Sequence, residues 1–592
     1  MKREIILRGL PASPGIAIGK AAYISQKSIR PARKIIDPSH VEAELFKLSS
    51  ALDKTRKEME KTRDKATKEM GEIFGRIFDS HLLILDDLLL IEEIEENIRT
   101  EKLSADNSVY KVFSKTYNTM LAQKKDYFRE RADDVRDVGT RLLFTMTGKP
   151  HKYGMKGNEP VIIAARILTP SEIVHIERNK LLGVITDLGG ETSHTAILAR
   201  ALEVPAVVGL KKASYYIESS ELLIVNGNTG RVIINPSKKR EEEYRQKQKR
   251  FFQFYIKLTD LKDLPAETLD HHKIKLMANI ELPSEVDAAN THGADGIGLF
   301  RTEYLYLMHN QFPSEEEQFK EYKYIIEKMA PKPVTIRTFD LGGDKAPSGL
   351  ETGREANPFM GFRAIRISLA QPEFFRIQLR AIYRASVYGK VNLMFPLLTG
   401  LAELRKIKSI IRSVKKELDS SNVPYDDNVN LGIMIETPSA VIMAPELAKE
   451  TNFFSIGTND LIQFTLAADR GNETIAKFFD NLHPAIFRMI KMTINAGNYA
   501  GIEVGMCGEM AGDPMATAIL VGLGLNNLSV SPLILPEIKK IIRSLTYSEM
   551  KDFADKMMTR KTSKDIRNHS QKFLFDRFAD LPIGINNRDG NG

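Results

Sequence analysis

The stretch LGIMIETPSA, residues 431–440, is a short apolar run that ends at a carboxylate, Glu436, and continues into a helix start containing proline. A run of this kind, without polar alternation, is typical of a strand buried on both faces, as in parallel sheets. Seven similar runs occur between residues 274 and 531, separated by segments of helical length. Together they predict a (β/α)8 barrel over roughly 280 residues. The eight runs are 274–280, 295–300, 334–340, 391–397, 431–437, 453–457, 504–508 and 528–531.

Polar side chains gather where these predicted strands end. In a barrel the carboxyl ends of the strands meet on one face, and that face carries the chemistry. Guanidinium groups bind carboxylate and phosphate bidentately, and Mg²⁺ takes one or two carboxylates plus substrate oxygens. The set therefore predicts a site for a phosphorylated carboxylic acid and a hard divalent cation. Its members, with those that follow closely, are Arg301, Arg337, Asp340, Lys345, Arg363, Glu436, Asn459, Asp460, Arg470 and Cys507.

Each of these residues also has a plainer explanation. A lone arginine or aspartate at a strand end is often a surface ion pair. Glu436 could cap the helix that TPSA begins. Cys507 could be an inert buried thiol or, placed among cations, a proton donor with a tuned pKa. The convergence of so many polar residues on one barrel face favours the site.

The first part of the chain predicts an α/β domain with a helical bundle inserted into it. Residues 39–149 contain no proline and repeat apolar positions at helical spacing, as in residues 73–98, while β-like segments lie on both sides. A charged run with i,i+4 pairings, residues 236–250, suits an exposed connecting helix. The predicted boundaries are 1–27 and 151–235 for the α/β domain, 28–150 for the bundle, 236–264 for the linker helix, 265–575 for the barrel and 576–592 for a flexible tail.

A second motif, GGETSHTAILAR at residues 189–200, places His194 between hydroxyl residues at a predicted helix start. A glycine turn before a helix N-terminus favours an anion, because free backbone N–H groups and the helix dipole point there. No GK[ST] follows, so the motif is not a nucleotide P-loop. His194 could be a capping or core histidine, but Thr192, Ser193 and Thr195 would offer hydroxyls to a phosphoryl group that the histidine itself bears.

Composition excludes several classes of function. No apolar run reaches the ~18 residues of a membrane span, and no secretory signal develops, so we expect a cytoplasmic protein without membrane insertion. The single cysteine fits a reducing compartment. The net charge of +8 comes from residues 237–250 and 537–592, a solvated helix and a basic tail, which argues against nucleic-acid binding.

These motifs closely resemble enzyme I of the phosphotransferase system, the phosphoenolpyruvate–protein phosphotransferase family. The resemblance runs nearly end to end, through PASPGIAIG, ERADDVRDVG, GGETSHTAILAR, DGIGLFRTEY, TFDLGGDK, NPFMGFRAIR, GIMIETPSA, FFSIGTNDLIQFTLAADRGN and GMCGEMAGD. Pyruvate phosphate dikinase and phosphoenolpyruvate synthase share the phosphohistidine domain and the barrel, but the chain leaves no segment for their ATP-grasp domain. The resemblance implies a swivelling phosphohistidine α/β domain with an inserted helical bundle, a TIM barrel and a homodimer formed through the barrel domain.

The resemblance also implies a phosphoryl relay. His194 would take the phosphoryl group from phosphoenolpyruvate on Nε2 and pass it to a histidine of the carrier protein HPr, docked on the helical bundle, in the first step of sugar uptake. Glu436 and Asp460 would hold Mg²⁺, and Cys507 would protonate the enolate to give pyruvate. The residues that would hold phosphoenolpyruvate are Arg301, Arg337, Lys345, Arg363, Asn459 and Arg470.

The chain departs from the family pattern in three places. Ile173 stands where a threonine is expected to orient the active histidine, residues 307–311 replace an MDRD-like turn, and the tail after Ser548 diverges. Two alternatives remain: a regulatory homologue that senses phosphoenolpyruvate, and the nitrogen-pathway paralogue, which has an additional N-terminal sensor domain. Because the chain starts directly with the PASPGIAIG region, we expect the sugar-type arrangement.

Overall fold

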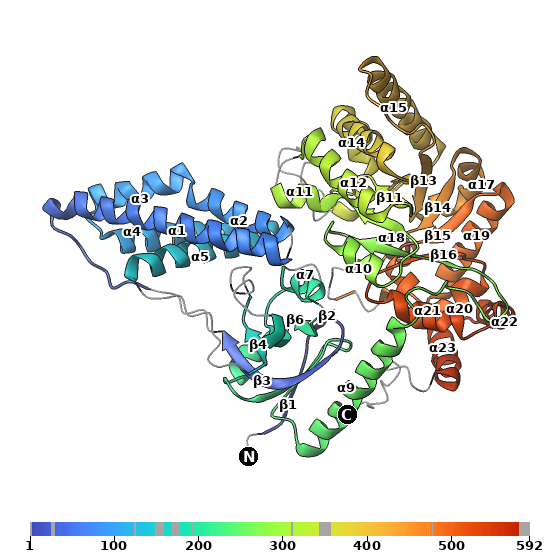
Figure 1. Ribbon diagram of the computed structural model, residues 1–592, viewed down its shortest axis with the longest axis horizontal. Helices are drawn as coiled ribbons and strands as arrows, with labels where there is room; N and C mark the ends of the chain where they lie inside the picture. The colour runs from blue at the N-terminus through green and yellow to red at the C-terminus, as the bar shows by residue number, and fades with distance from the viewer. Residues whose placement is uncertain are drawn as a thin grey trace. The chain divides into compact units, whose positions relative to one another are not determined.

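The computed structural model describes residues 3–24, 30–70, 72–122, 126–148, 159–168, 172, 178–190, 194–202, 204–309, 312–342, 357–469, 472, 474–475 and 478–578. The chain divides into two compact units, the first ending at Phe254 and the second beginning at Tyr255. The first contains a helical bundle and a mixed sheet, and the second contains a closed barrel (Figure 1).

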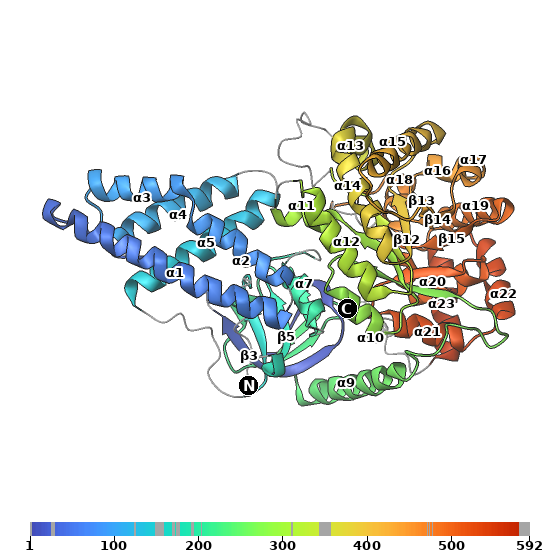
Figure 2. The ribbon, with the colours of Figure 1, turned by 45° about the horizontal axis from the view of Figure 1, so that its top comes forward.

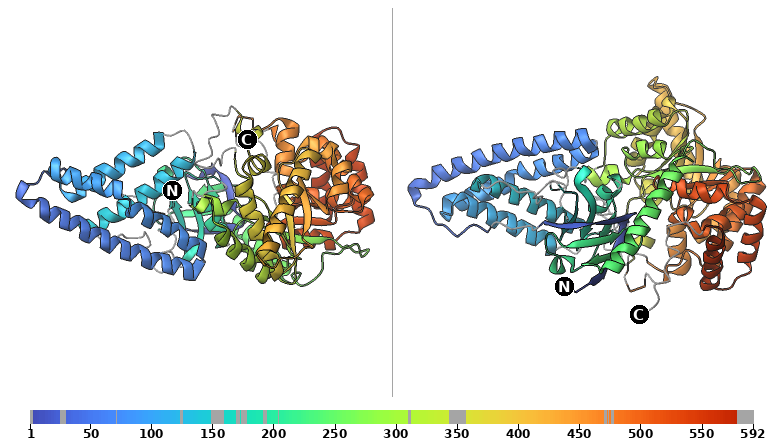
Figure 3. Two further views of the ribbon diagram at one scale, coloured as in Figure 1. Left: turned by 90° about the horizontal axis from the view of Figure 1, so that it is seen from above. Right: turned by 60° about the horizontal axis from the view of Figure 1, so that its bottom comes forward.

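Within the described residues, five helices form the bundle of the first unit. α1 packs against α2 and α5, and α4 packs against α3 and α5; Figure 3 shows α1 running along the length of the bundle. The helical spacing predicted for residues 73–98 is present as two helices, because Asp87 caps α3 by accepting hydrogen bonds from the Leu89 and Leu90 N–H groups. The helices are α1 (Val41–Met70), α2 (Glu72–Leu85), α3 (Leu88–Thr100), α4 (Ala105–Ala122) and α5 (Asp126–Thr147).

An eight-stranded mixed sheet forms the rest of the first unit, in the order β1-β8-β7-β3-β4-β5-β6-β2. β3 precedes the bundle in sequence and β4 follows it, yet the two pair in parallel at the centre of the sheet. This pairing confirms that the bundle is an insertion in an α/β fold. The strands are β1 (Ile5–Arg8), β2 (Leu10–Ser13), β3 (Ile16–Ile24), β4 (Val161–Ala165), β5 (Leu181–Thr186), β6 (Ala206–Val208), β7 (Leu222–Asn226) and β8 (Arg231–Ile234), with helices α7 (His194–Ala201), α8 (Ala213–Tyr216) and α9 (Lys238–Thr259).

The second unit is a closed barrel of eight parallel strands, as the sequence predicts (Figure 2). All eight apolar runs become strands, and their buried side chains, such as Ile433 and Ile435, are inaccessible to solvent because helices cover the barrel outside. The strands are β9 (Lys275–Ile280), β10 (Ile297–Arg301), β11 (Val334–Arg337), β12 (Val391–Phe395), β13 (Asn430–Ile435), β14 (Phe453–Ile456), β15 (Glu503–Met506) and β16 (Asn527–Val530).

Helices join these strands and surround the barrel. Several begin with a proline in the first turn behind a capping side chain, as Thr437 caps α16 and Asp513 caps α20. The helices are α10 (Glu285–Thr291), α11 (Glu303–His309), α12 (Glu315–Met329), α13 (Ile365–Ala370), α14 (Pro372–Ala385), α15 (Leu401–Ser420), α16 (Pro438–Ile442), α17 (Ala444–Leu447), α18 (Thr458–Leu466), α19 (Pro484–Ala500), α20 (Pro514–Gly522), α21 (Leu535–Arg543), α22 (Tyr547–Met558) and α23 (Ser563–Arg577).

The final helix α23 ends at Arg577, just inside the tail predicted from residue 576, and residues 579–592 lie outside the described part of the chain. Among the helices that are described, none combines the length and apolar character that crossing a lipid bilayer requires.

A buried carboxyl group makes the stability of the barrel unit sensitive to pH. Glu537 in the first turn of α21 has a buried Oε1 atom with no hydrogen-bond partner among the described residues. Burial, reinforced by the nearby Asp513, raises the pKa of Glu537 to about 8. Between the unfolded-state pKa near 4.5 and pH 8, the folded state therefore binds a proton that the unfolded state has released. The contribution of Glu537 to the free energy of unfolding decreases as pH rises through that window.

We expect Glu537→Gln to remove this dependence, because the amide keeps the shape of the protonated acid. Across the window, the free energy of unfolding of the wild type should fall more steeply with pH than that of the variant, by up to about 1.4 kcal/mol per pH unit. Urea unfolding of both proteins between pH 5 and 9 measures the difference. Parallel curves for wild type and variant would show that Glu537 is ionised in the folded protein.

Candidate active site

The register of the barrel places the predicted site residues side by side. β10 and β11 pair with Arg301 opposite Arg337, so two guanidinium groups leave adjacent strand ends. β13 and β14 pair with Ile435 opposite Ile456, which sets Glu436 beside the segment that leads to Asp460. Convergence at the carboxyl ends of the strands, expected from the sequence, is therefore present.

Buried carboxylates hold two of the arginines in place. Arg337 forms ion pairs with Glu303 at 3.0 Å and with Asp340 at 3.2 Å. Arg363 shares Asp340 at 2.9 Å and also reaches Asp460 at 3.3 Å through the same Nη2 atom. Asp340 thus joins the two guanidinium groups and fixes their separation.

These arginines still have unused donors. Nε of Arg337 and both Nε and Nη1 of Arg363 are buried without a hydrogen-bond partner in the described ranges. Buried polar groups in native proteins are nearly always paired, and an unpaired one costs about 1–3 kcal/mol. Three unpaired guanidinium nitrogens, one on Arg337 at the end of β11 and two on Arg363 beside it, are donors that a small dianion would satisfy.

Arg301 belongs to the same cluster through a different acid. Its Nη1 atom contacts Glu281, which directly follows β9, and its side chain is about one-third exposed. This arginine is therefore the more accessible of the three and lies at the rim of the strand ends.

Glu436 is almost fully buried, and it is not a helix cap. Thr437 caps α16 by accepting from the Ala440 N–H, whereas Oε1 of Glu436 accepts from the Leu397 N–H at 2.6 Å. Burial first, and then the charges of Asp460 and Asp340, raise the pKa of Glu436 well above its ordinary value. Carboxylates this close repel each other, so a cation between Glu436 and Asp460 would be strongly stabilised.

Gly457 makes room for this carboxylate. A Cβ atom at Gly457 would lie 2.8 Å from Oε2 of Glu436 and 2.9 Å from the Met434 side chain. Any larger residue would push Glu436 out of its position.

Asn459 and Cys507 lie at the ends of neighbouring strands. The Asn459 side chain exchanges two hydrogen bonds with Glu509: its Nδ2 donates to Oε1 at 2.8 Å, and its Oδ1 accepts from the backbone N–H at 3.1 Å. The Cys507 thiol is buried beside Leu299, Met394 and Met434. Burial raises the pKa of Cys507 above its ordinary value, partly offset by Ser455 and Arg337, so the thiol carries its proton at neutral pH.

The backbone of Cys507 is also fixed. Its carbonyl oxygen accepts from Nδ2 of Asn279 at 2.9 Å, and Oδ1 of Asn279 accepts from the Ser529 hydroxyl at 2.6 Å. Residues from β9 and β16 therefore orient the strand end that bears the thiol.

The glycine turn of the second motif is present in the first unit. Gly189 has φ +112, and α7 begins at His194. One part of the prediction is wrong: the hydroxyl of Thr195 donates to the Leu168 carbonyl at 3.3 Å in a buried position, so it does not face a phosphoryl group. This hydroxyl secures the helix start to the segment after β4.

Several predicted residues fall outside the description. They are Lys345, Arg470, Ile173, Thr192, Ser193, the side chain of His194 and part of residues 307–311. Within the described residues, no group of three or more His, Cys, Asp or Glu side chains has the arrangement of a metal site made by protein alone. A cation at the carboxylate pair Glu436 and Asp460 would therefore need further ligands from substrate or water.

The sequence pattern missed Glu281 and Glu303 and left Asp340 without a role. Glu303 stands two residues after Arg301 in the RTEY motif. That position was a usable signal, because a buried arginine at a strand end requires a carboxylate nearby. Its partner, however, is Arg337 on the next strand.

Family models match three segments of the chain. They are described as "PEP-utilising enzyme, N-terminal" over residues 8–131, "PEP-utilising enzyme, mobile domain" over 157–230 and "PEP-utilising enzyme, PEP-binding domain" over 256–547. The last covers the barrel and every described residue of the site.

Relatives match nearly the whole chain. A phosphoenolpyruvate-protein phosphotransferase of Haemophilus influenzae is 41% identical over 572 residues, covering 96% of this chain and 99% of the relative. One of Staphylococcus carnosus is 40% identical over 560 residues, covering 95% and 97%. A solved structure described as "NMR solution structure of Enzyme I (nEIt) protein using two 4D-spectra" is 42% identical, with a TM-score of 0.36, over 41% of this chain and 99% of that chain.

Proposed function

The chain belongs to the phosphoenolpyruvate–protein phosphotransferases, and from that premise we propose that it moves the phosphoryl group of phosphoenolpyruvate to His194 and then to a histidine of the carrier protein HPr. Pyruvate is the second product of the first half-reaction. The relay is the first step of sugar uptake by the phosphotransferase system.

The unpaired guanidinium N–H groups of Arg337 and Arg363 are the observation that supports this proposal most strongly. Phosphoenolpyruvate bears a carboxylate and a phosphate, and both accept paired hydrogen bonds from arginine. Phosphoryl transfer depends mainly on positioning and on neutralising charge. Arg301 adds a cation at the rim, and Lys345, Asn459 and Arg470 complete the set that the resemblance implies.

Glu436 and Asp460 would hold Mg²⁺, which fits the buried, mutually repelling carboxylate pair and the hard-oxygen donor set. When bound, the ion neutralises charge on the phosphoryl oxygens. Asp460 already pairs with Arg363, so that aspartate lies between the proposed cation position and the substrate clamp.

Cys507 would complete the first half-reaction. The bond between phosphorus and the bridging oxygen breaks, Nε2 of His194 forms a bond to phosphorus, and the enolate of pyruvate leaves. The Cys507 thiol then donates its proton to the methylene carbon of the enolate, and the thiolate regains a proton from water. A raised pKa keeps the thiol protonated and ready for this step.

His194 and the substrate clamp belong to different units of the chain. The proposal therefore requires that the first unit bring His194 to the barrel to receive the phosphoryl group, and then carry His194 away so that HPr can reach it.

Formation of a homodimer through the barrel unit is part of the same proposal. Sedimentation velocity that shows only monomer at micromolar concentration would count against the dimer.

A regulatory homologue that feeds a nitrogen-type phosphorelay is the second candidate, because the name phosphoenolpyruvate-protein phosphotransferase, which the relatives carry, fits either downstream pathway. The two differ in the acceptor they prefer. Transfer of ³²P from labelled phosphoenolpyruvate to purified sugar-type HPr and to its nitrogen-type counterpart, in parallel, decides between them. Faster labelling of sugar-type HPr is expected, and a preference for the other carrier would overturn the sugar-uptake assignment.

We expect Gly457→Ala to lower kcat/KM by roughly 10- to 100-fold, since the added methyl group would displace the Glu436 carboxylate from its cation position. The apparent Mg²⁺ requirement should rise with it. Gly400→Ala is the matched control, because a Cβ atom there meets nothing within 4 Å and the backbone is extended. Equal activity of both variants at low Mg²⁺ would show that Glu436 does not hold the cation.

We expect Cys507→Ala to bind phosphoenolpyruvate normally and to form pyruvate about 100- to 10,000-fold more slowly, the usual contribution of a general acid. In the wild type, pyruvate formation should fall at alkaline pH as the thiol loses its proton, and the variant should lack that fall. Single-turnover pyruvate assays across pH provide the measurement. Wild-type rates in the variant would show that water protonates the enolate unaided.

A further inference from the structure

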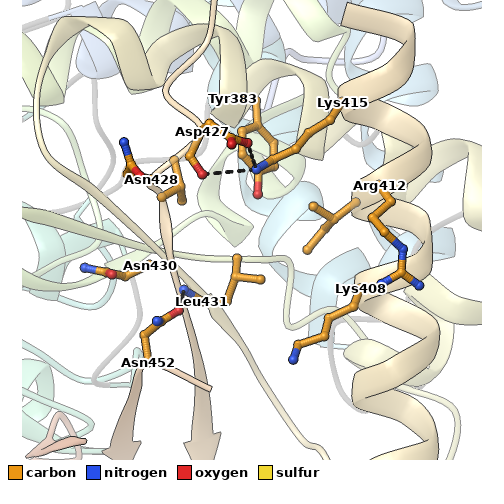
Figure 4. A pocket seen from close by; sticks show the side chains of 11 residues that line it. Tyr383, Lys408, Arg412, Lys415, Asp427, Asn428, Asn430, Leu431 and Asn452 are labelled. Atoms are coloured by element: carbon orange, nitrogen blue, oxygen red, sulfur yellow. Dashed lines mark hydrogen bonds and ion pairs between the residues drawn. The ribbon is translucent and has the colours of Figure 1, made fainter. Parts of the chain in front are cut away.

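A cavity of about 460 Å³ lies at the opposite end of two strands that lead to the active site (Figure 4). Asn430, the first residue of β13, and Asn452, just before β14, are in its wall. Six residues separate Asn430 from Glu436, which is roughly 20 Å along a strand. The cavity is therefore a separate place from the substrate clamp.

One face of α15 supplies the positive charge. Lys408, Ile411, Arg412 and Lys415 follow the spacing of residues that share a helix face. Figure 4 shows Lys408, Arg412 and Lys415 along one side of the cavity. Lys415 is already engaged, since its Nζ donates to Oδ1 of Asp427 at 2.5 Å. The lining contains three cations and one carboxylate, so Lys408 and Arg412 leave an excess of positive charge.

These two cations are only weakly compensated. The nearest acid to Lys408 is Glu450 at 3.6 Å, and Glu450 pairs more closely with Arg405 at 2.7 Å. Arg412 is exposed, and the ion pairs and hydrogen bonds among the described residues include none from its guanidinium group. A phosphate group bound between them would meet an ammonium and a guanidinium one helical turn apart.

Tyr383 is a second, independent sign of a ligand. Its side chain is completely buried in α14, yet the hydroxyl has no hydrogen-bond partner in the described chain. The ring lies under the Lys415 ammonium group, which is 5.1 Å from its centroid, and lines the cavity. A buried hydroxyl rarely stays unpaired in a native protein, so an oxygen atom inside the cavity is its natural partner.

Three asparagines form the other wall (Figure 4). Asn430 uses its Nδ2 to bond Asn392 at 3.1 Å, and Asn452 uses its Oδ1 to accept from the Leu431 N–H at 2.8 Å. The opposite ends of both amides are left for other partners, as is the side chain of Asn428. This leaves the Oδ1 acceptor of Asn430, the Nδ2 donor of Asn452 and the whole amide of Asn428. Such a set suits ligand hydroxyl groups, because a hydroxyl both donates and accepts.

We propose that this cavity binds a small hydroxylated phosphate ester, of the sugar-phosphate or polyol-phosphate class, with its phosphate on Lys408 and Arg412 and its hydroxyls on the asparagine wall. The volume lies in the range of about 300–1,000 Å³ typical of small-molecule sites. The charged and amide groups of the lining favour a polar ligand. The inference does not depend on the phosphoryl relay, because none of its residues belongs to the active site.

The test uses the full chain with ¹³C-labelled isoleucine δ-methyl groups, titrated with glycerol 3-phosphate. Ile411 lines the cavity, and Ile411→Val assigns its resonance by removing it. The Ile411 signal should shift saturably with a Kd of about 1 mM or below, and glycerol or inorganic phosphate alone should bind at least about tenfold more weakly. An Ile411 signal that does not move, or that moves equally with all three probes, overturns the proposal.

Variants separate the site from general charge effects. Lys408→Met with Arg412→Met should weaken glycerol 3-phosphate binding at least about tenfold. Lys416→Met with Lys449→Met removes the same charge from exposed positions outside the cavity and should leave the affinity unchanged. Equal weakening by both pairs, or none by the first, contradicts the site.

Tyr383→Phe gives two readouts that a merely structural hydroxyl would not produce together. Without ligand the melting temperature should stay or rise, because the variant buries no unpaired hydroxyl. The affinity for glycerol 3-phosphate should nevertheless fall severalfold. A variant with a lower melting temperature and unchanged affinity would show that the hydroxyl serves the fold and not a ligand.

Discussion

In the His194→Ala variant, incubation with Mg²⁺ and ³²P-labelled phosphoenolpyruvate is expected to leave no acid-labile label on the protein. The reason is chemical: only an imidazole nitrogen at this position accepts the phosphoryl group in the proposed relay, and alanine has no nucleophile. Phosphoenolpyruvate binding to the barrel should stay within about twofold of wild type, since mutations at distant sites act independently. Filter assays quenched at alkaline pH, which preserves a phosphohistidine, measure the label, and calorimetry measures phosphoenolpyruvate binding.

His271→Ala is the matched control, because His271 is a largely exposed histidine of the barrel unit. It should retain full labelling. A His194→Ala protein that still becomes labelled would place the acceptor elsewhere, and one that loses phosphoenolpyruvate binding as well would contradict two separate sites.

The Arg363→Lys variant is expected to bind phosphoenolpyruvate about 100-fold more weakly while remaining folded. Lysine retains the positive charge that Asp340 and Asp460 require, so the buried acids keep a counter-ion. It cannot replace the unpaired Nε and Nη1 donors of the planar guanidinium group. Calorimetric titration gives the affinity, and the melting temperature reports the fold.

Arg488→Lys makes the same change at an exposed position of α19 and should leave the affinity as it is. If Arg363→Lys binds phosphoenolpyruvate as tightly as wild type, the unpaired N–H groups are not substrate donors. The observation that supports the proposed function most strongly would then have another explanation.

The barrel could be predicted because its strands are uninterrupted apolar runs. Residues 432–435 are buried on both faces, and Glu436 marks where the strand ends. β2 was missed, since LPAS contains a proline and no apolar pattern and becomes a strand only by pairing with β6, almost two hundred residues later. Long-range pairing of this kind leaves no local signal.

The sequence allowed us to predict which residues lie at the strand ends, but not which acid forms an ion pair with which arginine. Arginine and carboxylate at strand ends follow from chain position: the register sets Arg301 opposite Arg337, and Ile435, just before Glu436, opposite Ile456. Which acid pairs with which arginine depends on how the barrel closes. Asp340 bridges two arginines, and Arg363 reaches an aspartate 97 positions later.

Thr195 shows that a hydroxyl residue beside a histidine in the sequence is not necessarily a phosphate ligand. Three hydroxyl residues flank His194, but helix geometry turns Thr195 into the core, where its hydroxyl bonds the Leu168 carbonyl. Residue type alone did not distinguish a hydroxyl that faces the core from one that faces a ligand. The backbone direction at the start of α7 decides it.

The most direct test of the account is to locate the phosphoryl group on the wild-type protein after a single turnover with labelled phosphoenolpyruvate and Mg²⁺. Phosphopeptide mass spectrometry under alkaline conditions keeps a phosphohistidine intact. The account predicts one phosphoryl group per chain, on His194, with one pyruvate released for each. Label on any other residue, or pyruvate released without label on the protein, would contradict it.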